Sequence, residues 1–111
     1  MNIQIFGKTK CFDTKKAQRW FKERNIKFQM IDLSQKGMSK GELDSVLRAV
    51  GGLDALIDDK SKGYASLAYL AYENDKYEKV LEDHLLMKTP VVRNGRQATV
   101  GYHPETWERW E

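Results

Sequence analysis

Residues 2–21 read N-I-Q-I-F-G-K-T-K-C-F-D-T-K-K-A-Q-R-W-F, and this stretch decides the fold. Its first part, residues 2–6, alternates polar and apolar side chains as a short β-strand does. Residues 7–11 break that alternation, and apolar side chains such as Ala17 and Trp20 then recur at helical spacing. The stretch therefore predicts a strand, a loop that ends at residue 11, and a helix.

A second strand follows closely. Asn25 is a suitable end for the helix, and residues 27–33, K-F-Q-M-I-D-L, alternate again with period two. A strand, a helix and a strand within about 32 residues have the size of a βαβ unit, whose two strands run parallel. We therefore expect the first two strands to pair in parallel.

Residues 36–86 predict an all-helical segment. Ser39 and Glu42 form a capping box, in which a hydroxyl and a carboxylate each accept a free backbone N–H, ahead of apolar residues at helical spacing. The helical pattern returns over residues 64–71 and again from Asp75, which we take as the N-cap of the last helix in this segment.

The C-terminal quarter predicts a β-hairpin and a final helix. Residues 89–93 and 97–101 are strand-like and flank Asn94-Gly95, a dipeptide suited to a tight type I′ turn. Pro104 then opens a short helix. The order β-α-β-(helices)-β-β-α predicts an α/β protein with a mixed sheet, thioredoxin-like or glutaredoxin-like, with the helical insertion between its halves.

Length and composition fit one globular domain. The chain has 111 residues and a net charge of +3, so we expect a single domain over residues 1–111 with the insertion at about 36–86. Its lysines are interspersed with acidic residues, which argues against direct nucleic-acid binding. No stretch approaches the roughly 20 apolar residues of a membrane-spanning helix, and the start has no basic leader. We therefore expect a cytoplasmic monomer that does not associate with a membrane.

Cys11 is the only cysteine and the main candidate for chemistry. A lone cysteine forms no internal disulfide and no cysteine-rich metal site, and we expect neither a metal nor a tightly bound cofactor. At the start of a helix, free N–H groups and the helix dipole favour the thiolate, as do four nearby lysines, Lys8, Lys10, Lys15 and Lys16. The alternative is that Cys11 is a small buried apolar residue.

Thr14 stands three residues after Cys11, where a dithiol oxidoreductase has its second cysteine. A dithiol mechanism is therefore excluded. A monothiol route remains, in which the Cys11 thiolate attacks an oxidised substrate or forms a mixed disulfide with a small thiol such as glutathione, and a second external thiol resolves it.

Thr89-Pro90 stands directly before the third predicted strand. A cis peptide bond at this position would put Thr89 opposite Cys11, ready to pair with an extended thiol peptide. A proline at a strand start is also compatible with a simple edge position, so both interpretations stay open.

Four stretches carry a resemblance to a known family. They are I-F-G-K-T-K-C-F-D-T-K-K-A at 5–17, Gly51-Gly52 with Tyr64-x-x-Leu67, K-T-P-V-V at 88–92 and V-G-Y-H-P-E at 100–105. In these stretches the chain is similar to the ArsC/Spx family of thioredoxin-fold proteins, which are arsenate reductase-like.

The resemblance implies a cysteine nucleophile at Cys11, a cis proline at Pro90 and a thiol-dependent reductase that uses glutathione or a similar thiol. The residues expected to bind that thiol and an oxidised substrate or oxyanion are Lys8, Lys10, Thr14, Lys15, Lys88, Thr89, Pro90 and His103.

The chain also departs from the family's pattern. Arsenate reductases of the family hold the oxyanion with arginines, and the matching places here are Asp58, Lys88-Thr89 and His103. An aspartate at such a place repels an oxyanion, so we do not expect arsenate reduction. Spx-like members are regulators that bind the α-subunit of RNA polymerase and sense oxidation through a C-x-x-C. Thr14 excludes that switch, but a redox-independent partner surface is the alternative function.

Other conspicuous residues are interpreted as structural. His84 has no second His or Cys at ligand spacing, so we expect no metal role for it. Packing against the sheet is the expected role of four aromatic residues, Trp20, Phe21, Trp107 and Trp110. His103 is equally compatible with a solvated turn and with a place near the thiol.

Overall fold

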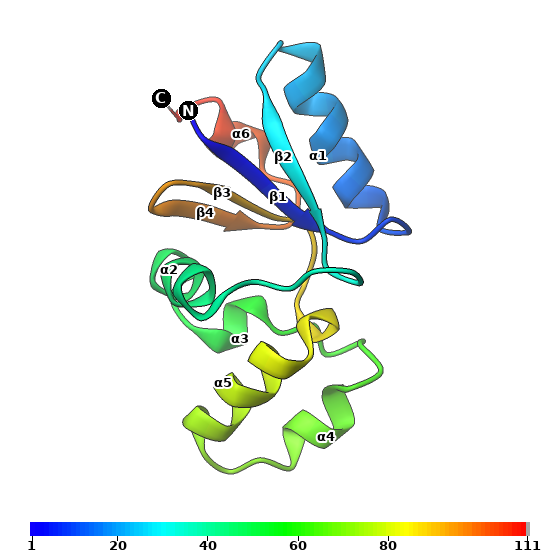
Figure 1. Cartoon of the computed structure of the whole chain (residues 1–111), viewed down its shortest axis with the longest axis vertical. Helices are drawn as coiled ribbons and strands as arrows, with labels where there is room; N and C mark the ends of the chain where they lie inside the picture. The colour runs from blue at the N-terminus through cyan, green and yellow to red at the C-terminus, as the bar shows by residue number, and fades with distance from the viewer. Residues whose placement is uncertain (111) are drawn as a thin grey trace.

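A four-stranded mixed sheet forms the centre of the protein (Figure 1). The computed structural model describes residues 1–110. The strands are β1 (Ile3–Gly7), β2 (Phe28–Asp32), β3 (Val91–Asn94) and β4 (Gln97–Val100), in the order β2-β1-β3-β4. β1 runs parallel to β2 and antiparallel to β3, and β3 runs antiparallel to β4. The predicted βαβ unit, the hairpin and the mixed sheet are all confirmed.

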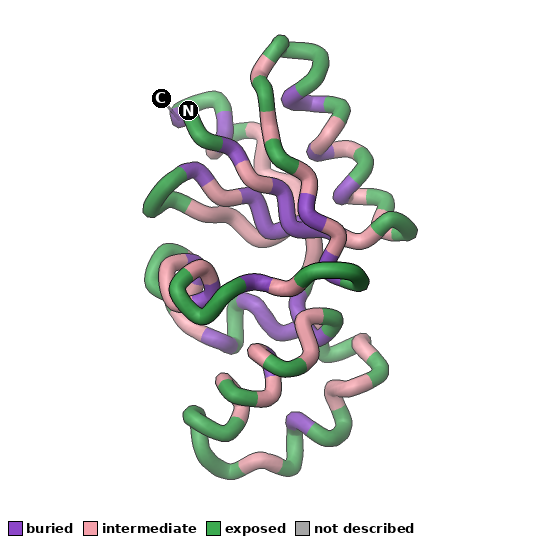
Figure 2. Tube along the Cα trace, in the orientation of Figure 1, coloured by how far each residue is buried: buried purple, intermediate pink, exposed green. Residues whose placement is uncertain are grey.

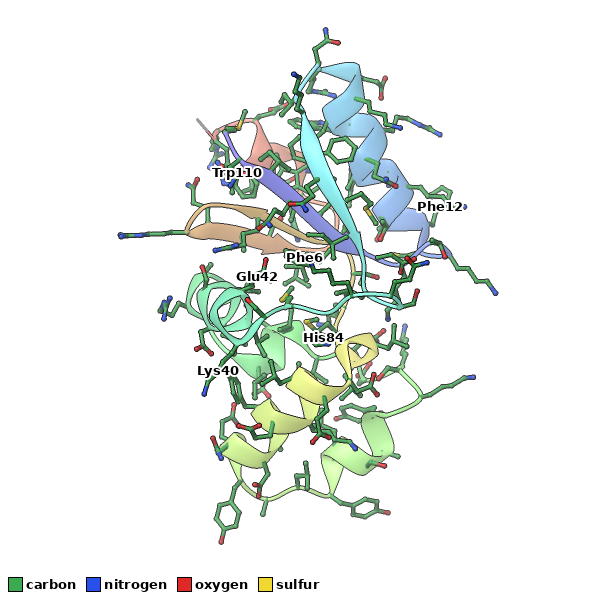
Figure 3. All side chains as sticks on the ribbon, viewed as in Figure 1. Phe6, Phe12, Lys40, Glu42, His84 and Trp110 are labelled. Carbon is green, nitrogen blue, oxygen red and sulfur yellow. The ribbon has the colours of Figure 1, made fainter. Side chains whose placement is uncertain are left out.

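The alternation along β1 explains why the protein has two hydrophobic cores. Successive side chains of a strand point to opposite faces of the sheet. Ile3 and Ile5 belong to the core on one face, and Phe6 belongs to the core on the other. Phe6 points from the sheet toward the helical segment that follows β2 (Figure 3). Both faces of β1 are therefore covered.

Helices α1 (Phe12–Glu23) and α6 (Pro104–Trp107) cover the face that carries Ile3 and Ile5. The rings of Trp20, Phe21 and Trp107 pack against one another, with centroid separations of 4.9 to 5.4 Å. The indole N–H of Trp107 donates to the Thr99 hydroxyl of β4 at 2.8 Å. The predicted packing role of these aromatic residues is confirmed.

The helical insertion covers the other face and lies below the sheet in Figure 1. It consists of α2 (Lys40–Val50), α3 (Leu53–Leu56), α4 (Tyr64–Ala68), α5 (Glu73–Glu82) and a 3-10 turn, η1 (His84–Leu86). The Ser39–Glu42 capping box forms as predicted, with N–H to oxygen distances of 2.9 and 3.2 Å. In Figure 2 the buried residues run along the central strands, while the far end of the insertion is largely exposed. Within residues 1–110, none of the helices is long and apolar enough to span a membrane.

Two local predictions were wrong. Asn94 belongs to β3 and pairs with Gln97, so the turn residues are Gly95 and Arg96, and only Gly95 has a positive φ (61°). That is the pattern of a type II′ turn. The second error concerns α5, which begins at Glu73, so Asp75 lies in its first turn and is not its N-cap. There its carboxylate still interacts favourably with the positive end of the helix dipole.

In the core between α1 and the sheet, truncating the side chain of Trp107 should lower the free energy of unfolding more than truncating any other. It is 1% exposed, and Trp107→Ala removes an indole that packs against α1 and donates a hydrogen bond to β4, so we expect a destabilisation of about 3–5 kcal/mol in urea unfolding. As a control, Tyr69→Ala at a 90% exposed position should change stability by no more than about 0.5 kcal/mol. Equal effects of the two substitutions would contradict this assignment of the core.

Candidate functional site

Cys11 is the N-cap residue of α1, directly after the loop that leaves β1. Its backbone is extended (φ −82°, ψ 119°), and its N–H donates to the Lys8 carbonyl at 3.0 Å, which closes the loop as a tight turn. The residue is half-buried. Its thiol donates to the Thr89 carbonyl oxygen, with 3.6 Å between Sγ and O. The interpretation of Cys11 as a fully buried apolar residue therefore does not hold.

The register between β1 and β3 explains why Thr89 lies beside the thiol. Phe6 pairs with Val91 in antiparallel strands, so the chain before β3 runs next to the chain after β1. The Thr89-Pro90 peptide bond is cis, as the resemblance implied. The carbonyl of Thr89 thus reaches the sulfur of Cys11, although 78 residues separate them in sequence.

Thr14 is a buried hydroxyl in the first turn of α1, at 1% exposure. Its Oγ1 accepts the Lys8 N–H at 3.5 Å. Gly7 makes room for it, because a Cβ at Gly7 would lie 2.4 Å from the Thr14 methyl carbon. The residue that replaces a second cysteine is therefore packed tightly between β1 and the sulfur.

The pKa of the Cys11 thiol is lowered by its surroundings. Partial burial is the largest single influence, and it acts in the opposite direction by raising the pKa. Hydrogen bonds from the side chains of Thr14 and Thr89, and from the N–H groups of Thr14 and Asp13, together outweigh burial because they favour the thiolate. A thiol with a lowered pKa is a better nucleophile near neutral pH.

The predicted lysines occupy different environments. The Lys8 ammonium donates to the carbonyls of Leu85 and Met87, at 3.1 and 3.4 Å, and so ties the Cys11 loop to the end of the insertion. Lys10 and Lys15 are exposed. The contribution of these lysines to the thiolate stays a prediction.

An open hollow of about 390 Å³ lies beside two neighbours of the thiol, Asp13 and Thr89. It is lined by Asp13, Asp58, Asp59, Lys60, Lys88, Thr89, Val100 and Gly101. Three of the residues that we matched to the family's oxyanion-binding arginines, namely Asp58, Lys88 and Thr89, therefore line the same hollow. Three carboxylates against two ammonium groups make this hollow a poor match for a multiply charged oxyanion.

The two histidines have local partners. His103 Nε2 lies 2.7 Å from the Val100 carbonyl oxygen, and its Nδ1 lies 3.1 Å from a Glu105 carboxylate oxygen. His84 Nε2 lies 3.1 Å from the Met38 carbonyl oxygen and packs against Gly37, where a Cβ would lie 2.1 Å from the ring. His84 therefore joins the insertion to the chain after β2, as a structural residue does. Among residues 1–110, no group of three or more His, Cys, Asp or Glu side chains is arranged to hold a metal ion.

The sequence did not predict a cluster of two aromatic rings and a lysine that begins at the residue after Cys11. Phe12 is 75% exposed, directly after Cys11, and the Lys16 ammonium lies 5.9 Å from its ring centroid and 4.3 Å from that of Tyr102. The spacing of Phe12 and Lys16 by four residues was visible in the sequence, but the position of Tyr102 was not. We call Phe12, Lys16 and Tyr102 the α1 platform.

A cysteine at the first turn of the βαβ helix, opposite a cis proline on a mixed sheet, defines a thioredoxin-like protein. The glutaredoxin-like NrdH-redoxin from Escherichia coli has the same fold, with a TM-score of 0.53, 19% identity, and coverage of 100% of this chain and 96% of that chain. Within this class the chain belongs to the ArsC family, whose family model matches residues 6–110.

Two similar proteins have different kinds of name. The global transcriptional regulator Spx 2 of Oceanobacillus iheyensis is 31% identical over 110 residues, which cover 95% of this chain and 80% of the relative. The solved structure of an arsenate reductase from Vibrio cholerae has a TM-score of 0.83 at 22% identity and covers 96% of this chain and 94% of its own. The latter likeness shows the fold alone.

Among the side chains around Cys11, that of Thr14 should lower the pKa of the thiol most. Thr14→Val keeps a similar shape but removes the hydroxyl, so the pKa of Cys11 should rise and alkylation by iodoacetamide at neutral pH should slow. Thr14→Ser retains the hydroxyl and should titrate close to wild type. An alkylation midpoint that is the same in wild type and Thr14→Val would show that the hydroxyl does not stabilise the thiolate.

Proposed function

We propose that the protein is a monothiol oxidoreductase of the ArsC family, with Cys11 as its nucleophile and glutathione or a similar small thiol as its cosubstrate. The observation that carries this proposal is a half-buried thiol of lowered pKa at the start of α1, with a buried threonine where a second thiol would stand. The open hollow is lined by Thr89, whose carbonyl contacts the sulfur, and by Asp13, two residues after Cys11, so we take it as the place where a small thiol approaches.

The proposed chemistry is a pair of thiol–disulfide exchanges. The Cys11 thiolate attacks one sulfur of an oxidised substrate disulfide, a new S–S bond forms, and the other sulfur leaves as a thiolate. A small thiol, as its thiolate, then attacks the mixed disulfide and releases Cys11. This second exchange at Cys11 leaves the retained half of the substrate joined to the small thiol as a disulfide, and a further small thiol reduces that disulfide in solution, so that two small thiols supply the two electrons and end as one disulfide. Cys11 is unchanged over the cycle.

Substrate and cosubstrate would bind around the same residues that the sequence indicated. Lys10, Lys15 and Lys88 supply exposed ammonium groups for the carboxylates of a small thiol, and the backbone of Thr89 faces the sulfur. Asp58 makes arsenate an unsuitable substrate, because it lines the hollow with two further carboxylates. We propose a cytoplasmic location, since a reducing compartment keeps both thiols in the reduced form.

Mass spectrometry with glutathione disulfide tests the monothiol proposal. The wild-type protein should form one adduct of glutathione at Cys11, and excess reduced glutathione should remove it. Cys11→Ser should form none, because its hydroxyl does not exchange with disulfides. A wild-type thiol that stays unmodified at neutral pH, at millimolar glutathione disulfide, would disprove the proposal.

A second candidate function is supported by a specific observation. The 31% identity to the regulator Spx 2 extends over 95% of this chain. The structure also has a hollow of about 370 Å³ between α2 and the β3–β4 turn, lined by Ser45, Arg48, Ala49 and Arg96. Two exposed arginines from two elements suit an acidic protein surface. In this alternative the protein binds the α-subunit of RNA polymerase without turning over a substrate.

Charge reversal separates the alternative from the reductase. If the regulator function is correct, Arg48→Glu with Arg96→Glu should weaken binding to the purified RNA polymerase α-subunit about tenfold or more. The matched control Arg19→Glu with Lys22→Glu makes the same charge change on exposed residues of α1 and should bind normally. Cys11→Ser should also bind normally, since Thr14 leaves no C-x-x-C switch. Absence of binding by the wild-type protein would exclude this partner.

A further inference from the structure

The α1 platform begins at the residue after Cys11 and combines exposed aromatic surface with a positive charge. Phe12 projects from the start of α1 (Figure 3) and is 75% exposed, although it directly follows Cys11. The Lys16 ammonium lies between this ring and the ring of Tyr102, at 5.9 and 4.3 Å from their centroids. Exposed single apolar residues are common. Here, however, an exposed ring and a positioned cation occur together beside the reactive sulfur.

The platform is anchored to the sheet. The Tyr102 ring packs edge-on against the buried Trp107, with centroids 5.4 Å apart. The preceding residue, Gly101, donates its N–H to the Pro90 carbonyl at 2.8 Å, next to the Thr89 carbonyl that faces the sulfur. The same core that supports α1 therefore holds Tyr102, and with it Lys16, in a fixed place relative to Cys11.

The platform and the open hollow have no residue in common. Successive residues of a helix are about 100° apart around its axis, and residues four apart share a face. Phe12 and Lys16 therefore share a face, while Asp13 belongs to the wall of the hollow. The hollow and the platform therefore offer different residues to a small thiol and to a larger ligand.

A ligand that covers both the sulfur and Lys16 must extend along the helix. Lys16 is five residues after Cys11, which corresponds to a rise of about 7.5 Å along the helix. Two residues of an extended polypeptide span about 6.6 Å. A carboxylate two residues from a cysteine in an extended chain can therefore reach the half-buried Lys16 ammonium while the cysteine sulfur meets Cys11. The exposed Phe12 ring, which directly follows Cys11 in the sequence, can pack against an apolar side chain of the same ligand.

We propose that the α1 platform selects protein substrates, namely extended polypeptides whose oxidised cysteine is two residues away from an Asp or Glu. This inference rests on the proposed thiol chemistry at Cys11. The Cys11 thiolate attacks the peptide cysteine sulfur, the S–S bond to its leaving group breaks, and the leaving group departs as a thiolate. Lys16 pairs with the peptide carboxylate, and Phe12 supplies apolar contact.

Two synthetic peptides test this selectivity. Both carry one cysteine as a mixed disulfide with 2-thiopyridine, and they differ only in having Glu or Gln two residues from that cysteine. Attack by Cys11 on the peptide sulfur releases 2-thiopyridone, which is followed by its absorbance in a single turnover. Each rate is divided by the same variant's rate with a small neutral pyridyl disulfide, so that changes in the thiol itself cancel.

The wild-type protein should react about three- to fivefold faster with the Glu peptide, the size expected of one half-exposed ion pair. Lys16→Gln should abolish this ratio, and Phe12→Ala should slow both peptides alike. Lys22→Gln, which removes the same charge from the exposed far end of α1, should keep the wild-type ratio.

Equal rates for the two peptides, or a preference that survives Lys16→Gln, would overturn the platform while leaving the monothiol chemistry intact. An unreactive Cys11 with every disulfide, the small neutral one included, would overturn both.

Discussion

The antiparallel pairing of β1 with β3 holds the two halves of the candidate site together. Cys11 follows β1 and Thr89 precedes β3, so the register of Phe6 with Val91 brings the sulfur to 3.6 Å from a carbonyl 78 residues away. The whole helical insertion lies between them, and closing so long a loop costs conformational entropy. Burial on both faces of β1 offsets that cost, because the two cores meet at this strand. The chemistry of the thiol therefore depends on the sheet.

Much of the fold could be predicted because it depends on local signals. Residues 2–6 alternate, Ser39 and Glu42 cap a helix, and each of these patterns was confirmed within a residue or two. The hairpin turn was displaced by one residue, since Asn94 has a long-range partner in the Asn2 N–H that sequence patterns do not reveal. At the site, the position of Cys11 was predictable from its strand-to-helix loop. The hydrogen bonds from the Lys8 ammonium to the carbonyls of Leu85 and Met87 could not be predicted, because their partners lie 77 and 79 residues further along the chain.

The Cys11 thiol and the hollow lined by Arg48 and Arg96 occupy separate parts of the fold. Cys11 lies where β1 meets α1, whereas Arg48 and Arg96 lie at the last turn of α2 and at the hairpin turn. The fold is shared by a protein named an arsenate reductase and by a relative named a regulator, which is consistent with this separation, since substitutions at one place need not alter the other. The same independence applies to Asp58 and Thr14: the resemblance in the sequence implied an arginine and a second cysteine at these two places, and the fold is retained without them.

The burial of Thr14 affects how long a mixed disulfide at Cys11 persists. In the proposed chemistry no group on the chain can displace a partner once it is attached to Cys11, because the place of a resolving thiol is filled by a hydroxyl wedged against Gly7. The lifetime of the attached state is then set by the concentration of free thiol around the molecule. The fraction of protein in that state at any moment would be a direct measure of how reducing its surroundings are.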